Sequence, residues 1–321
     1  MIRAESLTRQ YGPLLAVDRI SFTVQPGEVL GFLGPNGAGK STTMRMIAGF
    51  VPPTSGRAEI CGFSVEDQSL EARRRLGYLP EGAPSYGEMT VREILLFVAR
   101  IRGLRGDRLR LRFDDVVGRL ELASVLEQRV ETLSKGFRRR VGLAQAIVHD
   151  PPVLILDEPT DGLDPNQKHQ VRQLIGAMAK DKIIVISTHI LEEVDAVCSR
   201  AIIIAAGRVV ADETPDALVR RSRFHNAVTL RLESAATLRE VAQELGQLSG
   251  VASVEMSEAA RSVTAFPRAG AAVFAEIAAL AASRRWPLAQ LQLEAGRLDE
   301  VFRTITENAA AQAIAAPPGA V

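Results

Sequence analysis

The run of residues from 34 to 42 carries the pattern best suited to binding a phosphate. It reads Gly-Pro-Asn-Gly-Ala-Gly-Lys-Ser-Thr and fits G-x-x-x-x-G-K-[ST], a phosphate-binding loop. The apolar run 29–33 precedes it as a predicted buried strand, and residues 42–48 follow as a predicted helix. Glycines let the backbone wrap an anion, which the N–H groups of the helix start then face. A structural strand–helix turn is the alternative interpretation.

Every residue of this loop is a candidate nucleotide contact. We expect Lys40 to reach the β- and γ-phosphates, and Ser41 to hold Mg²⁺ through its hydroxyl. The predicted contacts are Gly34, Pro35, Asn36, Gly37, Ala38, Gly39, Lys40, Ser41 and Thr42.

Two acids follow a second predicted strand. Residues 153–156 form an apolar run, and Asp157 and Glu158 come directly after it. One acid beside a phosphate-binding loop suits Mg²⁺, and an adjacent one suits a general base for water. A helix cap is the alternative, but two carboxylates at the tip of a buried strand repel each other and need a reason. We therefore predict Asp157 as a metal ligand with Ser41, and Glu158 as the catalytic base.

Two further polar residues follow predicted strands. His189 comes after the strand predicted at 183–187, and Glu81 comes after the strand predicted at 76–80. Polar residues at the carboxyl ends of strands often serve the site in α/β sheets. We predict that His189 acts next to the γ-phosphate, with a structural histidine as the alternative. Glu81 is either a residue of the site or an exposed loop acid.

Three residues are weaker candidates for nucleotide contact. Tyr11 precedes a glycine and is either a stacking platform for adenine or a turn aromatic. Ser134 and Gly136 precede a predicted helix, so their hydroxyl and N–H could form a second anion site. An ordinary helix N-cap is the alternative for Ser134.

Composition limits the classes of protein that fit. The chain has 321 residues with 39 Lys+Arg against 38 Asp+Glu, a net charge of +1, which argues against binding nucleic acid mainly through phosphates. The two cysteines, Cys61 and Cys198, follow no C-x-x-C pattern and indicate reduced thiols in a cytosolic protein. No signal peptide is visible, and the apolar runs are too short to cross a bilayer. We expect any membrane role to come through a partner.

The elements that must position these residues form two regions. Strands predicted at 2–7 and 20–24, together with the strands predicted before the site residues, indicate an α/β core. Residues 90–130 read instead as a helical insertion that starts with a capping box at Thr90 and Glu93. The arginine-rich stretch 100–112 is a solvated face in one interpretation and a binding patch in the other.

In this order the motifs resemble the nucleotide-binding subunit of ATP-binding cassette (ABC) transporters, over about residues 1–220. The resemblance implies a P-loop NTPase (RecA-like) core with an antiparallel β edge and a helical subdomain at about residues 88–150. The loop 34–42 corresponds to Walker A, 133–137 to the signature, 157–158 to the end of Walker B, 162–164 to the D-loop and His189 to the switch histidine. Tyr11 falls at the family's A-loop aromatic.

The resemblance also implies how the site works. ATP and Mg²⁺ would bind the loop of one subunit, and the signature of a second subunit, with Ser134 and Gly136, would cap them. Asp157 would support Mg²⁺, Glu158 would polarise water and His189 would sense the γ-phosphate. A homodimer or paired ATPase subunit, a separate integral-membrane permease and a place on the inner face of the cell membrane follow, with no nucleic acid.

Two departures from the family pattern indicate a subclass. Lys135 and Phe137 stand where the signature L-S-G-G-Q has Gly and Gln, and Glu81 stands where the Q-loop has glutamine. Both departures resemble exporter ATPases of the gliding-motility and drug-resistance type. Glu81 adds negative charge near the expected γ-phosphate. A soluble ABC ATPase with a regulatory, non-transport role is the alternative function, although such ATPases typically carry two cassettes or a long coiled coil.

The C-terminal part follows a different pattern. Strand and helix patterns alternate as βαββαβ between residues 223 and 306, which predicts a small α+β ferredoxin-like domain without a catalytic constellation. It resembles the accessory domain of the same exporter ATPases. For residues 307–321, rich in alanine and proline, we expect a disordered tail.

Overall fold

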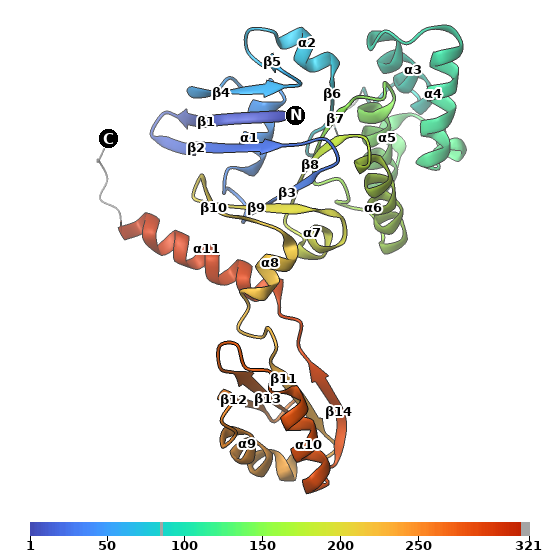
Figure 1. The fold of residues 1–321 in the computed structure, drawn as a ribbon. Helices are drawn as coiled ribbons and strands as arrows, with labels where there is room; N and C mark the ends of the chain where they lie inside the picture. The colour runs from blue at the N-terminus through green and yellow to red at the C-terminus, as the bar shows by residue number, and fades with distance from the viewer. Residues whose placement is uncertain (84–85, 316–321) are drawn as a thin grey trace. The chain divides into compact units, whose positions relative to one another are not determined.

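The computed structural model describes residues 1–83 and 86–315 (Figure 1). The chain divides into two compact units, one formed by residues 1–215 with the chain from 305 onward, the other by residues 216–304. Among the described helices, none combines the length and the apolar character that crossing a bilayer requires.

The first unit is built on a six-stranded sheet that is parallel except for one edge strand. Its order is β10 (Arg208–Glu213), β9 (Arg200–Ala205), β3 (Val29–Leu33), β8 (Ile183–Thr188), β7 (Val153–Asp157), β6 (Leu76–Leu79), with β10 antiparallel to β9. Every residue of β3, β7 and β8 is buried. Strands covered on both faces need continuous apolar sequence, which is why these runs were visible in the chain.

The register of the three central strands brings the predicted site residues to one edge. Leu33 pairs with Thr188, and Asp157 pairs with Ser187 on the other side of β8. The segments that follow β3, β7 and β8 therefore start side by side. They carry the glycine-rich loop, Glu158 and His189.

A second, antiparallel sheet has the order β2 (Leu14–Val24), β1 (Ile2–Tyr11), β4 (Ser55–Ile60), β5 (Phe63–Ser64). β1 and β2 are longer than the sequence pattern predicted, because Tyr11 pairs with Leu14 across a tight turn. Gly12 has a φ of +55° in that turn. Shifts of register after Ala4, Leu7 and Arg9 interrupt the strict alternation of apolar and polar residues.

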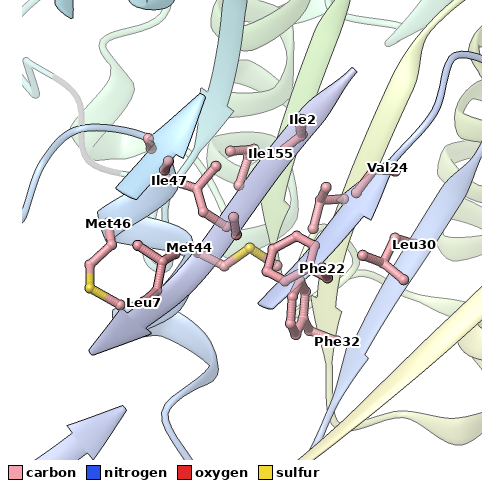
Figure 2. Close-up of a cluster of buried hydrophobic side chains, with 14 of the residues drawn as sticks. Ile2, Leu7, Phe22, Val24, Leu30, Phe32, Met44, Met46, Ile47 and Ile155 are labelled. Carbon is pink, nitrogen blue, oxygen red and sulfur yellow. The ribbon is translucent and has the colours of Figure 1, made fainter. Parts of the chain in front are cut away.

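The core of the first unit lies where the two sheets meet α1 (Lys40–Ile47). Figure 2 shows Phe22 of β2 beside Phe32 of β3, with ring centroids 5.0 Å apart. Met44 and Ile47 of α1 are completely buried in the same cluster, with Leu7 of β1. The helix that carries the lysine of the loop is thereby fixed against both sheets.

Helices α3 (Val91–Ile101), α4 (Gly106–Arg119) and α5 (Lys135–Ile147) group together (Figure 1, green). The predicted capping box is confirmed: Thr90 Oγ1 accepts from the Glu93 N–H, and Glu93 Oε2 accepts from the Thr90 N–H. In the arginine-rich stretch, Arg112 donates to the carbonyls of Ile147 and Val148, which ties α4 to α5. The remaining helices of this unit are α2 (Ser69–Arg74), α6 (Pro165–Ala179) and α7 (Leu191–Val197).

The second unit has its own sheet and core. Its order along the chain is β11 (Val228–Leu232), α9 (Leu238–Gly246), β12 (Val251–Ser257), β13 (Ser262–Pro267), α10 (Phe274–Arg284), β14 (Leu288–Leu293). The sheet is antiparallel with the order β12-β13-β11-β14. Leu230, Val241, Val263 and Ile277 are fully buried between the sheet and the helices.

Two helices pass from one unit into the other. These are α8 (Pro215–Arg220) and α11 (Leu298–Ala315). The expectation of a disordered tail from residue 307 is wrong up to residue 315, because α11 continues to Ala315. Five of the residues from 309 to 315 are alanine, which has the highest helix propensity. Residues 316–321 lie outside the described part of the chain.

Candidate functional site

The glycine-rich loop joins β3 to α1, and its backbone needs glycine at defined positions. Gly37 and Gly39 have φ values of +80° and +107°, which L side chains rarely adopt. A Cβ on Gly34 would lie 2.3 Å from the carbonyl oxygen of Ile204 on β9. The helix begins at Lys40, two residues earlier than predicted, so that residue lies in the first turn. The N–H groups of this turn have no partner within the helix and are suited to an anion.

Lys40 is buried beneath the loop. Its Nζ donates to the carbonyls of Gly34 at 2.7 Å and Pro35 at 3.0 Å. Burial lowers the pKa of Lys40, and the carboxylates of Glu158 and Asp157 act in the opposite direction. The loop thus holds a cation at its centre, where a polyphosphate would bind.

Asp157 and Ser41 form a pair that fits a magnesium ion. Asp157 is 1% exposed; its Oδ1 accepts from Ser187 Oγ and lies 3.5 Å from Ser41 Oγ. In the described chain, Asp157 Oδ2 has no hydrogen-bond partner. A buried carboxylate oxygen without a partner is unfavourable unless a cation meets it. Among the described residues, no three His, Cys, Asp or Glu side chains are placed to hold a metal ion together. An ion held by Ser41 and Asp157 would take its other ligands from phosphate and water.

Glu158 and His189 contact each other at the edge of the sheet. His189 Nδ1 lies 2.9 Å from Glu158 Oε1. Glu158 itself has a φ of +50°, and its N–H donates to the Ser187 carbonyl at 2.9 Å. A left-handed backbone at a residue other than glycine is strained, and such strain gathers at functional sites. The side chain of Glu158 contacts His189 and also lines the cavity beside the loop that carries Lys40.

One cavity of about 420 Å³ collects most of the predicted nucleotide site. This volume lies within the range of small-molecule sites. The predicted site residues that line it are Tyr11, Asn36, Gly37, Gly39, Lys40, Ser41, Thr42, Glu81 and Glu158. Residues from four separate segments of the chain thus share one cavity.

Tyr11 and Glu81 are far apart in the sequence, but both line this cavity. Tyr11 is 43% exposed, and the Arg9 guanidinium carbon lies 4.5 Å from its ring centroid. Glu81 is exposed in the loop after β6. Both are accessible to a ligand, and their roles stay predictions.

Ser134 and Gly136 are not among the residues that line this cavity. Ser134 Oγ accepts from the Phe137 N–H at 3.3 Å and so caps α5. A Cβ on Gly136 would lie 2.8 Å from Gln167 Oε1 of α6, the far end of a side chain that can move aside. Within one chain Ser134 caps a helix, and neither residue reaches the cavity beside the glycine-rich loop.

Sequence reasoning missed two buried charged residues that hold the site. Glu193 is 2% exposed and accepts from the hydroxyls of Thr160 and Thr188, which precede the D-loop and His189. Burial raises the pKa of Glu193. Arg139 of α5 is 5% exposed and donates to the carbonyls of Pro80, Asp157 and Glu158. For Arg139, the only signal in the sequence was a charge in a segment predicted as a helix, and no prediction covered the segment of Glu193.

Comparison with known proteins finds similarity to the ATP-binding proteins of ABC transporters. The family described as ABC transporter matches residues 17–161. The Nod factor export ATP-binding protein I of Paraburkholderia xenovorans (strain LB400) is 40% identical over 219 residues, which are 68% of this chain and 72% of that protein. The probable multidrug ABC transporter ATP-binding protein YbhF of Escherichia coli (strain K12) is 36% identical over 223 residues, 69% of this chain and 38% of that protein.

A solved structure agrees with these relatives. The ATP-binding subunit of an ABC transporter superposes with a TM-score of 0.65 and 32% identity. The match covers 69% of this chain and 92% of the other.

Proposed function

The chain belongs to the ABC transporter family, and on that premise we propose that it is the ATPase subunit that drives an exporter through a separate membrane permease. The observation that carries the proposal is the contact between Glu158 and His189 beside the cavity of Lys40. The Glu158 carboxylate shares this cavity with the phosphate-binding loop and contacts the His189 imidazole. The relatives named for Nod factor export and multidrug transport support export as the direction of transport.

Hydrolysis follows from the roles that these side chains can take. ATP places its polyphosphate in the loop, where Lys40 and the N–H groups of α1 balance its charge. Glu158 accepts the proton of the attacking water, and His189 orients the carboxylate through Nδ1. Mg²⁺, held by Ser41 and Asp157, would supply a cation for the charge that develops on the phosphates. The reaction yields ADP and phosphate.

We further propose that two subunits share each site. Ser134 and Gly136 sit at the N-terminus of α5 and do not line the cavity of their own chain. The N-terminus of α5 faces no acid of its own first turn, so an anion brought by another subunit would be favoured there. A homodimer, or a pair with a similar ATPase, would complete both sites.

The second unit is proposed to be a ferredoxin-like accessory domain. The order βαββαβ along the chain and β12-β13-β11-β14 across the sheet support this assignment. It would have no part in the catalytic chemistry, because every residue proposed for that chemistry lies in the first unit.

Replacing Glu81 by glutamine should leave binding of ATP with Mg²⁺ equal or tighter. Glu81 lines the cavity, and its negative charge would repel the γ-phosphate of a bound ATP. Titration calorimetry would measure the change, with Glu88→Gln as control because Glu88 is an exposed acid of the same segment. Clearly weaker binding would mean that Glu81 is itself a metal ligand.

A second cavity suggests where the permease docks. It has a volume of about 790 Å³, and its lining includes the exposed side chains Phe50, Leu70 and Ile101, at 66%, 70% and 67% exposure. Large apolar side chains exposed together indicate a partner surface. Arg73 and Arg102 also line it, which favours an acidic, apolar segment of the permease. Pro80 lines it too, so a segment docked there would contact the loop that carries Glu81.

Ile101→Glu should weaken the complex with the permease at least tenfold and leave ATP binding unchanged. The chain would be co-expressed with the membrane protein encoded beside its gene, and the detergent-solubilised complex would be quantified by affinity purification. Leu111→Glu is the matched control, because Leu111 is 69% exposed on α4 and does not line the cavity. A chain that hydrolyses ATP but forms no complex would support the soluble regulatory alternative instead. Formation of the complex would place the protein at the inner face of the cell membrane.

A further inference from the structure

Arg139 connects the helix of the signature to the catalytic loops. It lies on α5, five residues after Ser134, and it is 5% exposed. Its Nη1 donates to the Pro80 carbonyl at 3.0 Å, and its Nη2 donates to the carbonyls of Asp157 and Glu158. One side chain therefore contacts the residue before Glu81, the metal-binding candidate and the candidate base.

The burial of this guanidinium needs a reason. Among the described residues it donates to backbone carbonyls and to no carboxylate, and its Nε has no partner. Burying a charge is unfavourable without strong compensation. Burial lowers the pKa of Arg139, and the negative charges of Asp161, Asp157, Glu158 and Glu81 act in the opposite direction. The guanidinium is thus buried against three carbonyls at the edge of the candidate site.

The geometry also explains how Glu158 keeps its unusual backbone. Its φ of +50° is strained for a residue with a side chain, so something must hold it. The Glu158 N–H is bound by the Ser187 carbonyl, and the Glu158 carbonyl is bound by Arg139. The peptide units on both sides of the Glu158 Cα are thus held, which fixes the direction of the side chain toward His189.

We propose that Arg139 is a positioning residue that sets the orientation of Glu158 and links it to the signature helix and to the Glu81 loop. The proposal rests on the function proposed above, because it assigns Arg139 a part in that ATPase reaction. A planar guanidinium presents several donors in a rigid fork, which a lysine ammonium cannot reproduce. Movement of α5 would be transmitted to Glu158 through the carbonyls of Asp157 and Glu158, and to the Glu81 loop through the carbonyl of Pro80.

Arg140, the next residue, supplies a matched control. It is 6% exposed on the same helix, yet its Nη1 donates to the Leu120 carbonyl at 3.1 Å, within the helical part of the unit. Substituting either arginine removes a buried guanidinium from α5. Only the substitution of Arg139 removes contacts to Pro80, Asp157 and Glu158.

The test compares Arg139→Gln, Arg139→Lys and Arg140→Gln in the full-length chain. We expect both Arg139 variants to lower kcat by about 10–100-fold, since misplacement of a catalytic group by about 1 Å can cost 10²-fold. The Kd for ATP should change by less than about threefold, because the loop of Lys40 is untouched. Arg140→Gln should lower the melting temperature comparably and leave kcat within about threefold. Phosphate release, titration calorimetry and thermal unfolding measure the three quantities.

A second comparison shows whether Arg139 acts through Glu158. Added to Glu158→Gln, the substitution Arg139→Gln should reduce the residual single-turnover rate by less than about threefold, because the group it positions has gone. A further loss as large as in the parent would overturn the proposal. So would full activity of Arg139→Lys, or an equal loss of kcat in Arg140→Gln. A parent chain that hydrolyses no ATP would instead contradict the proposed function.

Discussion

The chain with Glu158→Gln is expected to bind ATP and Mg²⁺ normally and to hydrolyse ATP about 10²–10⁴-fold more slowly, the usual effect of losing a positioned base. Glutamine has nearly the same shape as glutamate but cannot accept the proton of the attacking water. Lys40, Ser41 and Asp157, the residues proposed to bind the phosphates and Mg²⁺, are unchanged. Titration calorimetry and a phosphate-release assay would separate the two effects.

The same variant should accumulate a closed dimer when ATP is added. If two subunits share each site, binding of ATP favours closure, and hydrolysis is what reverses it. Size-exclusion chromatography with light scattering, with and without ATP, would show the change in mass. Glu192→Gln is the control, because Glu192 is an exposed acid on α7, close to His189 in the sequence. Full activity of Glu158→Gln would remove Glu158 from the role of base.

Lys40→Ala should remove most of the ATPase activity and weaken ATP binding. Hydrogen bonds to a charged group contribute about 1.5–3 kcal/mol each, so the loss of contacts to two phosphates should lower kcat/KM by about 10²-fold or more. The variant also loses the bonds from Nζ to the carbonyls of Gly34 and Pro35, so the loop itself becomes less ordered.

Lys180→Ala is the control for this variant, since Lys180 is an exposed lysine at the end of α6. Circular dichroism would show that both variants fold. Turnover of Lys40→Ala near that of the parent would mean that the cavity beside the loop is not the catalytic site. In contrast to Glu158→Gln, Lys40→Ala should form no dimer on addition of ATP, because it lacks the bound nucleotide that favours closure.

Local chemistry in the chain was enough to identify the candidates for the catalytic half of the site. The phosphate-binding loop needs glycines and a lysine at fixed spacing within nine consecutive residues, so the motif can be recognised from the sequence alone. Asp157, Glu158 and His189 could be identified as candidates because each lies at or just after the end of a predicted buried strand. In a parallel sheet the carboxyl ends of such strands lie at one edge. The pairing of β3 with β8 and β8 with β7 makes these ends neighbours.

Other features depended on contacts between segments far apart in the chain, and the sequence pattern could not contain them. The hydrogen bonds of Arg139 and Glu193 are made with carbonyls and hydroxyls of other segments, which no local spacing encodes.

The sequence by itself therefore determined which groups could bind a phosphate, hold a metal ion and accept a proton, because those properties belong to single side chains and short loops. Tertiary structure alone decided how these groups are oriented. The left-handed backbone of Glu158 and its contact with His189 are held by bonds from β8 and α5. Such orientation is a property of the packed fold, since strain at one residue persists only where its neighbours over-determine it.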